Sequence, residues 1–145
     1  MMQLGSALVG GASAELFLLA RLLFGGVIAF MGLNHFLNGE DMIAYARTKG
    51  LPAPSLAVYG SGAMLAFGGL SIALGAVPLL GAVALVVFFV VVTPTMHDFW
   101  NVDDPQQQQS ELTDFLKNVA LVGVSFGFLA LSRASWPYAL DVGLF

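Results

Sequence analysis

Four long apolar stretches alternate with shorter polar segments along the chain. The first, residues 16–37, would extend about 33 Å as a helix at about 1.5 Å per residue, against a hydrocarbon core of about 30 Å. Three more such stretches cover residues 56–76, 79–96 and 112–131. This pattern predicts an all-α membrane protein: a four-transmembrane-helix up-down bundle in a single domain over residues 1–145, with both termini on the same membrane face.

The first stretch carries two ionisable side chains within its apolar sequence, Arg21 and His35. Together with Gly25, Ile28 and Gly32 they recur at helical spacing, so they form one stripe along the helix. A charge inside a membrane span costs about 3 kcal/mol or more unless it is paired or solvated, so we expect this stripe to face protein. A role for Arg21 in packing or topology and a role in ligand binding are both open. Its candidate partners are freed backbone carbonyls and the side chains of Glu15, Ser71 and Ser125.

Small residues form one face of the second stretch. Gly62, Ala66, Gly69 and Ala73 recur at helical spacing, and small side chains let two helix backbones approach closely in lipid. A tight turn at residues 75–78 follows, which predicts that the second and third helices are antiparallel neighbours. The second stretch is therefore expected to pack closely against another helix.

The connecting segments predict further local structure. Residues 42–49 fit a short interfacial helix, and Pro94 is expected to kink or end the third helix. Residues 101–111, NVDDPQQQQSE, are acidic and low in complexity, which predicts a mobile loop, with the fourth helix starting at Ser110. The two long connections are expected to share one membrane face.

Aromatic residues follow the third and fourth stretches. Phe99 and Trp100 come directly after the third, and Trp136 and Tyr138 come after the fourth. Amphipathic aromatic rings are enriched at the level of the lipid headgroups. We therefore predict these four residues as interfacial anchors.

Composition supports a membrane protein and narrows its partners. Hydrophobic residues make up 58% of the chain and charged residues 10%, with a mean hydropathy of +0.86, far outside the range of soluble domains. The net charge of -4 comes from acids crowded into the loops, which argues against nucleic acid or anionic lipid as a partner. The chain has no cysteine, which excludes disulfides, thiol catalysis, iron–sulfur clusters and thiolate zinc sites within it. Residues 1–15 carry no positive charge before a weak apolar stretch, so we expect the first span to be retained rather than cleaved.

Polar side chains from four separate segments are expected at the face that carries the two long loops. These side chains are two imidazoles, a phenol, a lysine and an amide, and they are expected at one depth in the bundle. We therefore predict that they form a polar rim that binds a ligand. Each member also has a structural alternative: a bond to a helix carbonyl for His35, a helix cap for His97, and an ion pair with Asp98 or Asp114 for Lys117. The predicted rim consists of His35, Tyr59, His97, Asp98, Lys117 and Asn118.

Short motifs follow one another in a fixed order: RLLFG, GLNHF, KGLP, SG and then GGL, HDFW, and FLKNVALVG. In order and spacing they resemble the DoxX family of small four-helix membrane proteins, over about residues 21–131. The family takes its name from a subunit linked to a terminal quinol oxidase and to thiosulfate:quinone oxidoreduction, and some members are tied to membrane oxidoreductase complexes that handle oxidative stress. The resemblance implies that the residues matching the recurrent family pattern are Arg21, His35, Gly62, His97, Phe99, Trp100, Lys117 and Asn118.

Two functions follow as hypotheses. The first is a quinone-linked accessory subunit of an oxidoreductase system in the cell membrane, with His35, His97, Tyr59 or Lys117 donating a hydrogen bond to a quinone carbonyl. The alternative is a non-catalytic membrane scaffold, or a carrier of a small molecule or lipid, that acts through a partner protein. Haem ligation by His35 and His97 is a third interpretation. The sequence has no metal-ligand spacing and no catalytic motif, so enzymatic activity stays open, and its glycine faces allow a homo-oligomer.

Overall fold

The computed structural model describes residues 11–142, which form helices and connecting loops and contain no strand. The prediction for the N-terminal residues 1–15 therefore lies partly outside the described residues, since α2 is described from Gly11. Four of the helices are long and apolar enough to cross a membrane, which confirms the predicted all-α membrane protein. The elements in chain order are α2 (Gly11–Leu37), α3 (Gly39–Thr48), α4 (Pro54–Leu74), α5 (Pro78–Met96), the 3-10 helix η1 (Phe99–Asn101) and α6 (Pro105–Leu131).

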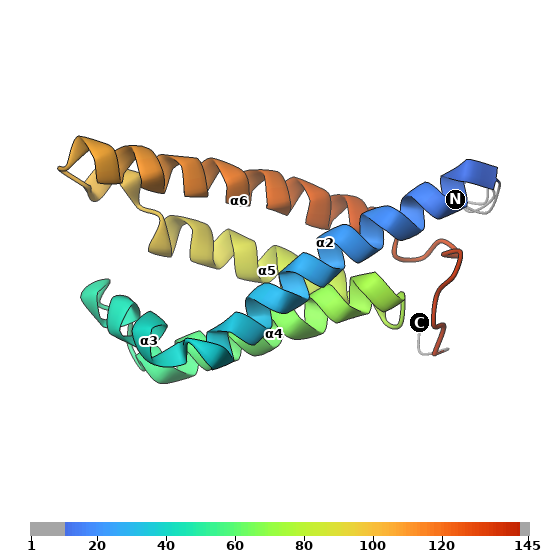
Figure 1. Ribbon diagram of the computed structural model, residues 1–145, viewed down its shortest axis with the longest axis horizontal. Coiled ribbons are helices and arrows are strands. Elements are labelled where there is room, and N and C mark those ends of the chain that lie inside the picture. The colour runs from blue at the N-terminus through green and yellow to red at the C-terminus, as the bar shows by residue number, and fades with distance from the viewer. Residues whose placement is uncertain (1–10, 143–145) are drawn as a thin grey trace.

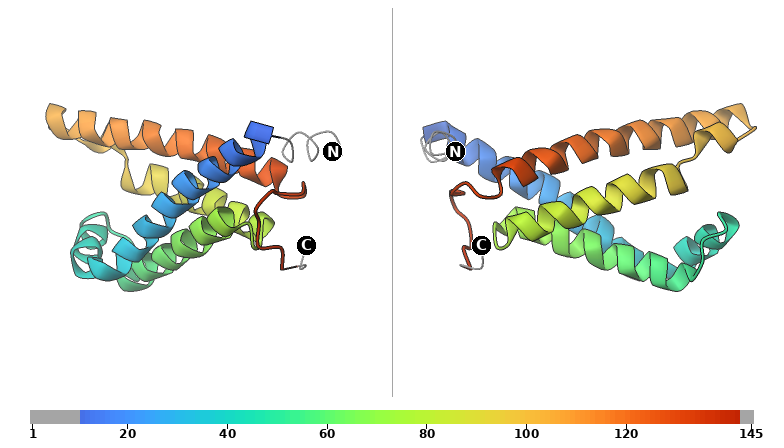
Figure 2. Two further views of the ribbon diagram at one scale, coloured as in Figure 1. Left: turned by 45° about the vertical axis from the view of Figure 1, so that its right-hand side comes forward. Right: turned by 180° about the vertical axis from the view of Figure 1, so that it is seen from behind.

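The four long helices run in alternating directions, so the described chain begins and ends at the same end of the bundle (Figure 1). We call this the terminal end, and the opposite end, with α3 and η1, the loop end. α2 lies against α4, α4 lies beside α5, and α5 lies beside α6. The α2–α4 pair and the α5–α6 pair are close together at the terminal end and diverge toward the loop end (Figure 2).

Glycines bring the backbones of α2 and α4 into direct contact. A Cβ atom placed on Gly25 would lie 2.5 Å from the carbonyl oxygen of Gly69, and one placed on Gly32 would lie 2.6 Å from that of Gly62. Real Cβ atoms essentially never come so close to another atom. The predicted small-residue face of the second span is therefore confirmed, and its partner is the glycine stripe of α2 that also carries Arg21.

Two apolar clusters hold the helices together. The main core joins all four long helices through buried side chains such as Ile28, Leu65, Leu85 and Phe128. A smaller cluster of Ile43, Ala46 and Val58 fixes α3 against the start of α4. The predicted short helix at 42–49 is thus confirmed as α3, and it is anchored to the α2–α4 half of the bundle.

The prediction of a mobile loop at residues 101–111 is wrong, because α6 begins at Pro105 rather than at Ser110. The Asp104 carboxylate accepts a hydrogen bond from the backbone N–H of Gln107 at 2.9 Å and so caps the helix. An Asp–Pro pair supplies a cap followed by a residue suited to the first helical position, and glutamine is a good helix former. At the other end of the same connection, α5 contains Pro94 and ends two residues later, at Met96, as expected.

Candidate functional site

Arg21 is completely buried at the terminal end, where it bonds backbone carbonyls of two segments. Its Nε–H donates to the carbonyl oxygen of Ile72 at 3.2 Å, and its Nη2 group donates to that of Ala73 at 3.1 Å. Its Nη1 and Nη2 groups also donate to the carbonyl oxygens of Pro137 at 2.6 Å and Tyr138 at 3.2 Å. Carbonyls near the C-terminal end of a helix lack intrahelical partners, so the guanidinium satisfies the end of α4 and the following C-terminal segment at once.

Aromatic rings enclose the Arg21 guanidinium. Its central carbon lies 5.3 Å from the centre of the Trp136 ring and 5.8 Å from that of Phe17. The indole ring is buried in the protein, and its N–H donates to the carbonyl oxygen of Leu131 at 2.8 Å, so Trp136 packs against other residues of the chain, and its predicted interfacial depth remains a prediction. The prediction that backbone carbonyls bind Arg21 is confirmed by these four hydrogen bonds. Arg21 is therefore a structural clamp between α2, α4 and the C-terminal segment.

The cavity suited to a ligand lies at the opposite, loop end of the bundle. It has a volume of about 640 Å³ and lies between α4 and α5, where the two helices diverge, with α3 and the end of α2 completing its wall. Its lining is mostly apolar, with a few polar groups, as in typical small-molecule sites. Representative lining residues are Met42, Ala46, Val58, Met64, Phe88 and Val92.

His35 is the titratable group that α2 contributes to the cavity wall. Its Nδ1 atom lies 2.8 Å from the carbonyl oxygen of Met31, one helical turn back. A carbonyl only accepts hydrogen bonds, so Nδ1 carries a proton. In the neutral ring Nε2 then has a free lone pair, and in the charged ring Nε2 becomes a second donor.

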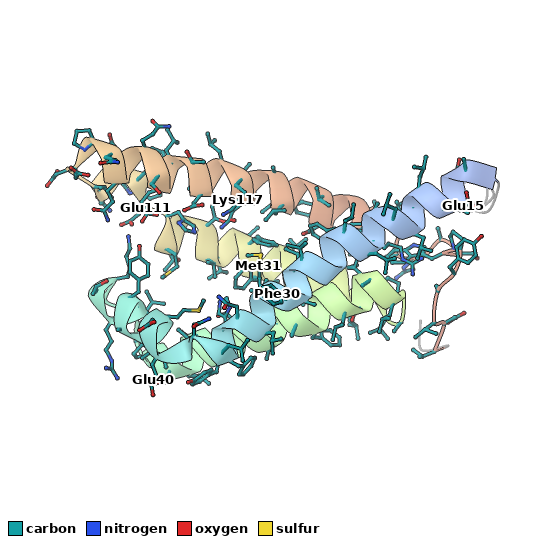
Figure 3. All side chains as sticks on the ribbon, viewed as in Figure 1. Glu15, Phe30, Met31, Glu40, Glu111 and Lys117 are labelled. Carbon is teal, nitrogen blue, oxygen red and sulfur yellow. The ribbon has the colours of Figure 1, made fainter. Side chains whose placement is uncertain are left out.

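Tyr45, Glu111 and His97 form a chain of hydrogen bonds beside the cavity. Tyr45, which lines the cavity, donates from its hydroxyl to Oε1 of Glu111 at 3.0 Å, and Nδ1 of His97 lies 2.8 Å from Oε2 of the same carboxylate. Glu111 is only 9% exposed, near the loop end of α6 (Figure 3). A buried carboxylate needs donors on both oxygens, and it receives one from α3 and one from the residue after α5.

A second link joins α3 to the segment that follows α5. The Lys49 ammonium group lies 2.5 Å from Oδ1 of Asp98, whose Oδ2 accepts a hydrogen bond from the Asn101 side chain at 3.1 Å. Burial acts to lower the pKa of Lys49, but the hydrogen bond to Asp98 and neighbouring negative charge outweigh it and raise the pKa. Together the two links tie α3 to the α5–α6 half of the bundle across the loop end of the cavity.

The pKa of Tyr45 is raised above its ordinary value of 10.0, first by burial and then by its hydrogen bond to the Glu111 carboxylate. The tyrosinate absorbance of Tyr45 is obtained as the difference between the wild type and Tyr45→Phe. We expect the midpoint of this titration to lie above pH 10, and we expect Glu111→Gln to lower it. Since the folded state holds this proton more tightly than the unfolded state, the stabilisation is present below the ordinary pKa and is lost as pH rises through the raised one. An unchanged midpoint in Glu111→Gln, measured against Tyr45→Phe, would contradict the bond.

The structure divides the predicted polar rim among several places. His35 lines the cavity, while His97 and Asp98 belong to the two links described above. Tyr59 lies on the outer face, where its ring stacks on Phe36 with centroids 5.6 Å apart.

The two rim residues of α6 lie on different sides of that helix. Lys117 is more than half exposed and pairs with Asp114 at 2.8 Å, whereas Asn118 is buried. Pairing of Lys117 with Asp98 is therefore wrong, because Asp98 pairs with Lys49. Phe99 and Trp100 pack with Phe115 in a cluster, and their interfacial depth remains a prediction.

Sequence reasoning missed Tyr45, Lys49 and Glu111 as members of the site. Glu111 did carry a signal, because it precedes Asn118 by seven residues and Ser125 by fourteen, and all three are buried on one side of α6. A carboxylate on the inner stripe of a helix needs a partner, which would have pointed to His97. Nothing comparable distinguishes Tyr45 or Lys49 from ordinary exposed residues of a short helix.

Comparison with known proteins gives one positive result. A family model described as DoxX matches residues 16–98, more than half of the chain, which includes Arg21, His35, α3, α4, α5 and the His97–Asp98 pair. No curated protein and no solved structure matches the chain. Within residues 11–142, no three side chains of His, Asp or Glu come together as potential metal ligands.

Proposed function

Since the chain belongs to the DoxX family, we propose that this membrane protein holds a quinol in the cavity between α4 and α5, as an accessory subunit of an oxidoreductase system in the cell membrane. The single observation that carries the proposal is an apolar cavity of about 640 Å³ with an imidazole in its wall. Typical small-molecule sites measure about 300–1,000 Å³ and combine apolar walls with a few polar groups.

The chemistry of His35 fits both redox forms of such a molecule. With Nδ1–H donated to the Met31 carbonyl, the neutral ring accepts a hydrogen bond from a quinol hydroxyl through Nε2. The protonated ring donates to a quinone carbonyl instead, so His35 takes one of the two protons that leave a quinol on oxidation, and the other passes to water. When bound, a quinol supplies two electrons and two protons, and the electrons would pass to a redox group of a partner subunit.

Two other polar groups in the cavity wall, the hydroxyls of Ser61 and Tyr45, already donate hydrogen bonds within the protein. The Ser61 hydroxyl donates to the carbonyl oxygen of Val58 at 2.9 Å, and the Tyr45 hydroxyl donates to Glu111. Each of these oxygens keeps a lone pair that accepts a further hydrogen bond. The polar groups therefore favour a hydroxyl-bearing ligand, which donates, over one that only accepts.

We expect His35→Ala to weaken the binding of a benzoquinol by about tenfold or more, the typical worth of one buried hydrogen bond to an imidazole. Protein in lipid nanodiscs would be titrated with the quinol under reducing conditions, and the dissociation constant would be measured by calorimetry. Tyr59→Phe is the matched control, because Tyr59 lies at the same end of the bundle but does not line the cavity.

A wild-type protein that neither binds a benzoquinol nor copurifies with a quinone from its own membrane would overturn the proposal. The carrier alternative draws on the same apolar cavity, and mass spectrometry of gently extracted protein distinguishes the two. A stoichiometric quinone favours the oxidoreductase role, and a stoichiometric phospholipid or another lipid favours the carrier.

A further inference from the structure

One rim of the cavity is built from exposed apolar residues of two neighbouring spans. Leu56 and Gly60 contribute it from α4, and Val87 and Val91 contribute it from α5; the leucine and both valines are among the exposed large hydrophobic residues. Gly60 has open space around it, since a Cβ placed there would meet no atom within 4 Å. These residues line the cavity and also face the outside of the bundle.

Other parts of the cavity wall come from α2 and α3. α2 packs along α4 and contributes His35, and α3 lies across the loop end, tied to α6 by the Tyr45–Glu111 hydrogen bond. Seen from the side opposite α2, no helix lies over the space between α4 and α5 (Figure 2, right). The cavity is therefore open along the rim formed by the exposed residues of α4 and α5.

The α5 side of this rim lies well inside a membrane-spanning helix. Val87 and Val91 are 9 and 13 residues beyond Pro78 in a helix of 19 residues, so they lie near its middle and in its second half. A group placed at this rim of a spanning helix meets lipid tails rather than water. The part of the rim that Val87 and Val91 form is thus accessible from the bilayer.

We infer that the gap between Leu56–Gly60 and Val87–Val91 is a lateral opening to the bilayer, through which an amphiphile places a hydroxylated ring beside His35 and leaves its long hydrocarbon tail among the lipids. The inference rests on the proposed function and adds to it the route of entry and the class of ligand. The tail concentrates the ligand in the bilayer beside the opening, since each methylene favours transfer out of water by about 0.8 kcal/mol. A tailed ring fits the cavity only while the opening lets its tail reach the lipids, whereas a tail-less ring is held by its head alone.

The test compares two ligands with the same dimethoxy-methyl benzoquinol head, one bearing a decyl tail and one without a tail. Gly60→Trp would fill the opening, and Gly26→Trp is the matched control, because a Cβ placed on Gly26 of α2 would also meet no atom within 4 Å and this residue does not line the cavity. We expect Gly60→Trp to weaken the tailed ligand about tenfold or more and the tail-less ligand less than about threefold. Gly26→Trp should change neither dissociation constant.

The outcomes separate the opening from the binding site itself. Unchanged binding of the tailed ligand to Gly60→Trp, or an equal loss of both ligands, would overturn the opening while leaving the proposed function intact. No binding of either ligand to the wild type would instead overturn the proposed function. Should Gly60→Trp fail to fold, Val91→Trp closes the opening from α5, with Val119→Trp on the exposed side of α6 as its control.

Discussion

Gly25→Ala is expected to destabilise the protein by about 3 kcal/mol or more, the upper range for overpacking, although it adds a single methyl group. The added Cβ would lie 2.5 Å from the carbonyl oxygen of Gly69 and 2.6 Å from the backbone nitrogen of Ala73. Both are backbone atoms of α4, which cannot rotate away as a side chain can. The steric clash can therefore be relieved only if α2 and α4 move apart, which weakens the other contacts along the glycine stripe of α2.

Gly26→Ala makes the same chemical change at the adjacent residue and serves as the control. A Cβ at Gly26 would meet no atom within 4 Å, so only the intrinsic preference of a helix for alanine remains, which stabilises by up to about 1 kcal/mol. Both variants would be unfolded reversibly in mixed micelles while helicity is followed by circular dichroism. Equal stabilities of the two variants would show that α2 and α4 are not in backbone contact.

The contrast between these glycines marks how far the sequence predicts the fold. Helical spacing placed Gly25 and Gly32 on one stripe and Gly62 and Gly69 on another, and each stripe predicted a close approach. The sequence did not say that the two stripes face each other, because a small-residue face is compatible with any neighbour of similar shape. Which two stripes face each other depends on how all four spans pack together, and the spacing of residues within one span does not contain this information.

The candidate site was less predictable than the spans, for a related reason. Depth along the bundle follows from span boundaries, and because α6 begins at Pro105, Lys117 and Asn118 lie near the middle of that helix rather than at its start, where the sequence placed them (Figure 3). Direction around each helix decides which of them meet, and here Tyr59 faces outward while His97 turns to Glu111. Glu111 itself lay in a segment expected to be a loop or the first turn of a helix, where a carboxylate is usually solvated.

Arg21→Leu is expected to cost about 3 kcal/mol or more of stability, since a hydrogen bond to a charged group contributes about 1.5–3 kcal/mol and Arg21 makes several. The substitution keeps an apolar side chain of moderate size but leaves carbonyl oxygens of Ile72, Ala73, Pro137 and Tyr138 without the guanidinium donors. Each unsatisfied buried carbonyl costs about 1–3 kcal/mol unless water reaches it. Arg133→Leu, at an exposed position of the C-terminal segment, is the control and should change stability by less than about 0.5 kcal/mol.

A local signal distinguishes loss of the clamp from general destabilisation. The Trp136 ring is buried against Arg21, so in a Trp100→Phe background its emission should shift to longer wavelength in Arg21→Leu under conditions where helicity is unchanged. Arg21→Lys separates charge from geometry: an ammonium group keeps the charge but offers three donors from one nitrogen, whereas the guanidinium reaches carbonyls of two segments from three nitrogens. If Arg21→Lys has wild-type stability and emission, a buried cation suffices, and the bonding pattern of Arg21 is not what joins the C-terminal segment to α4.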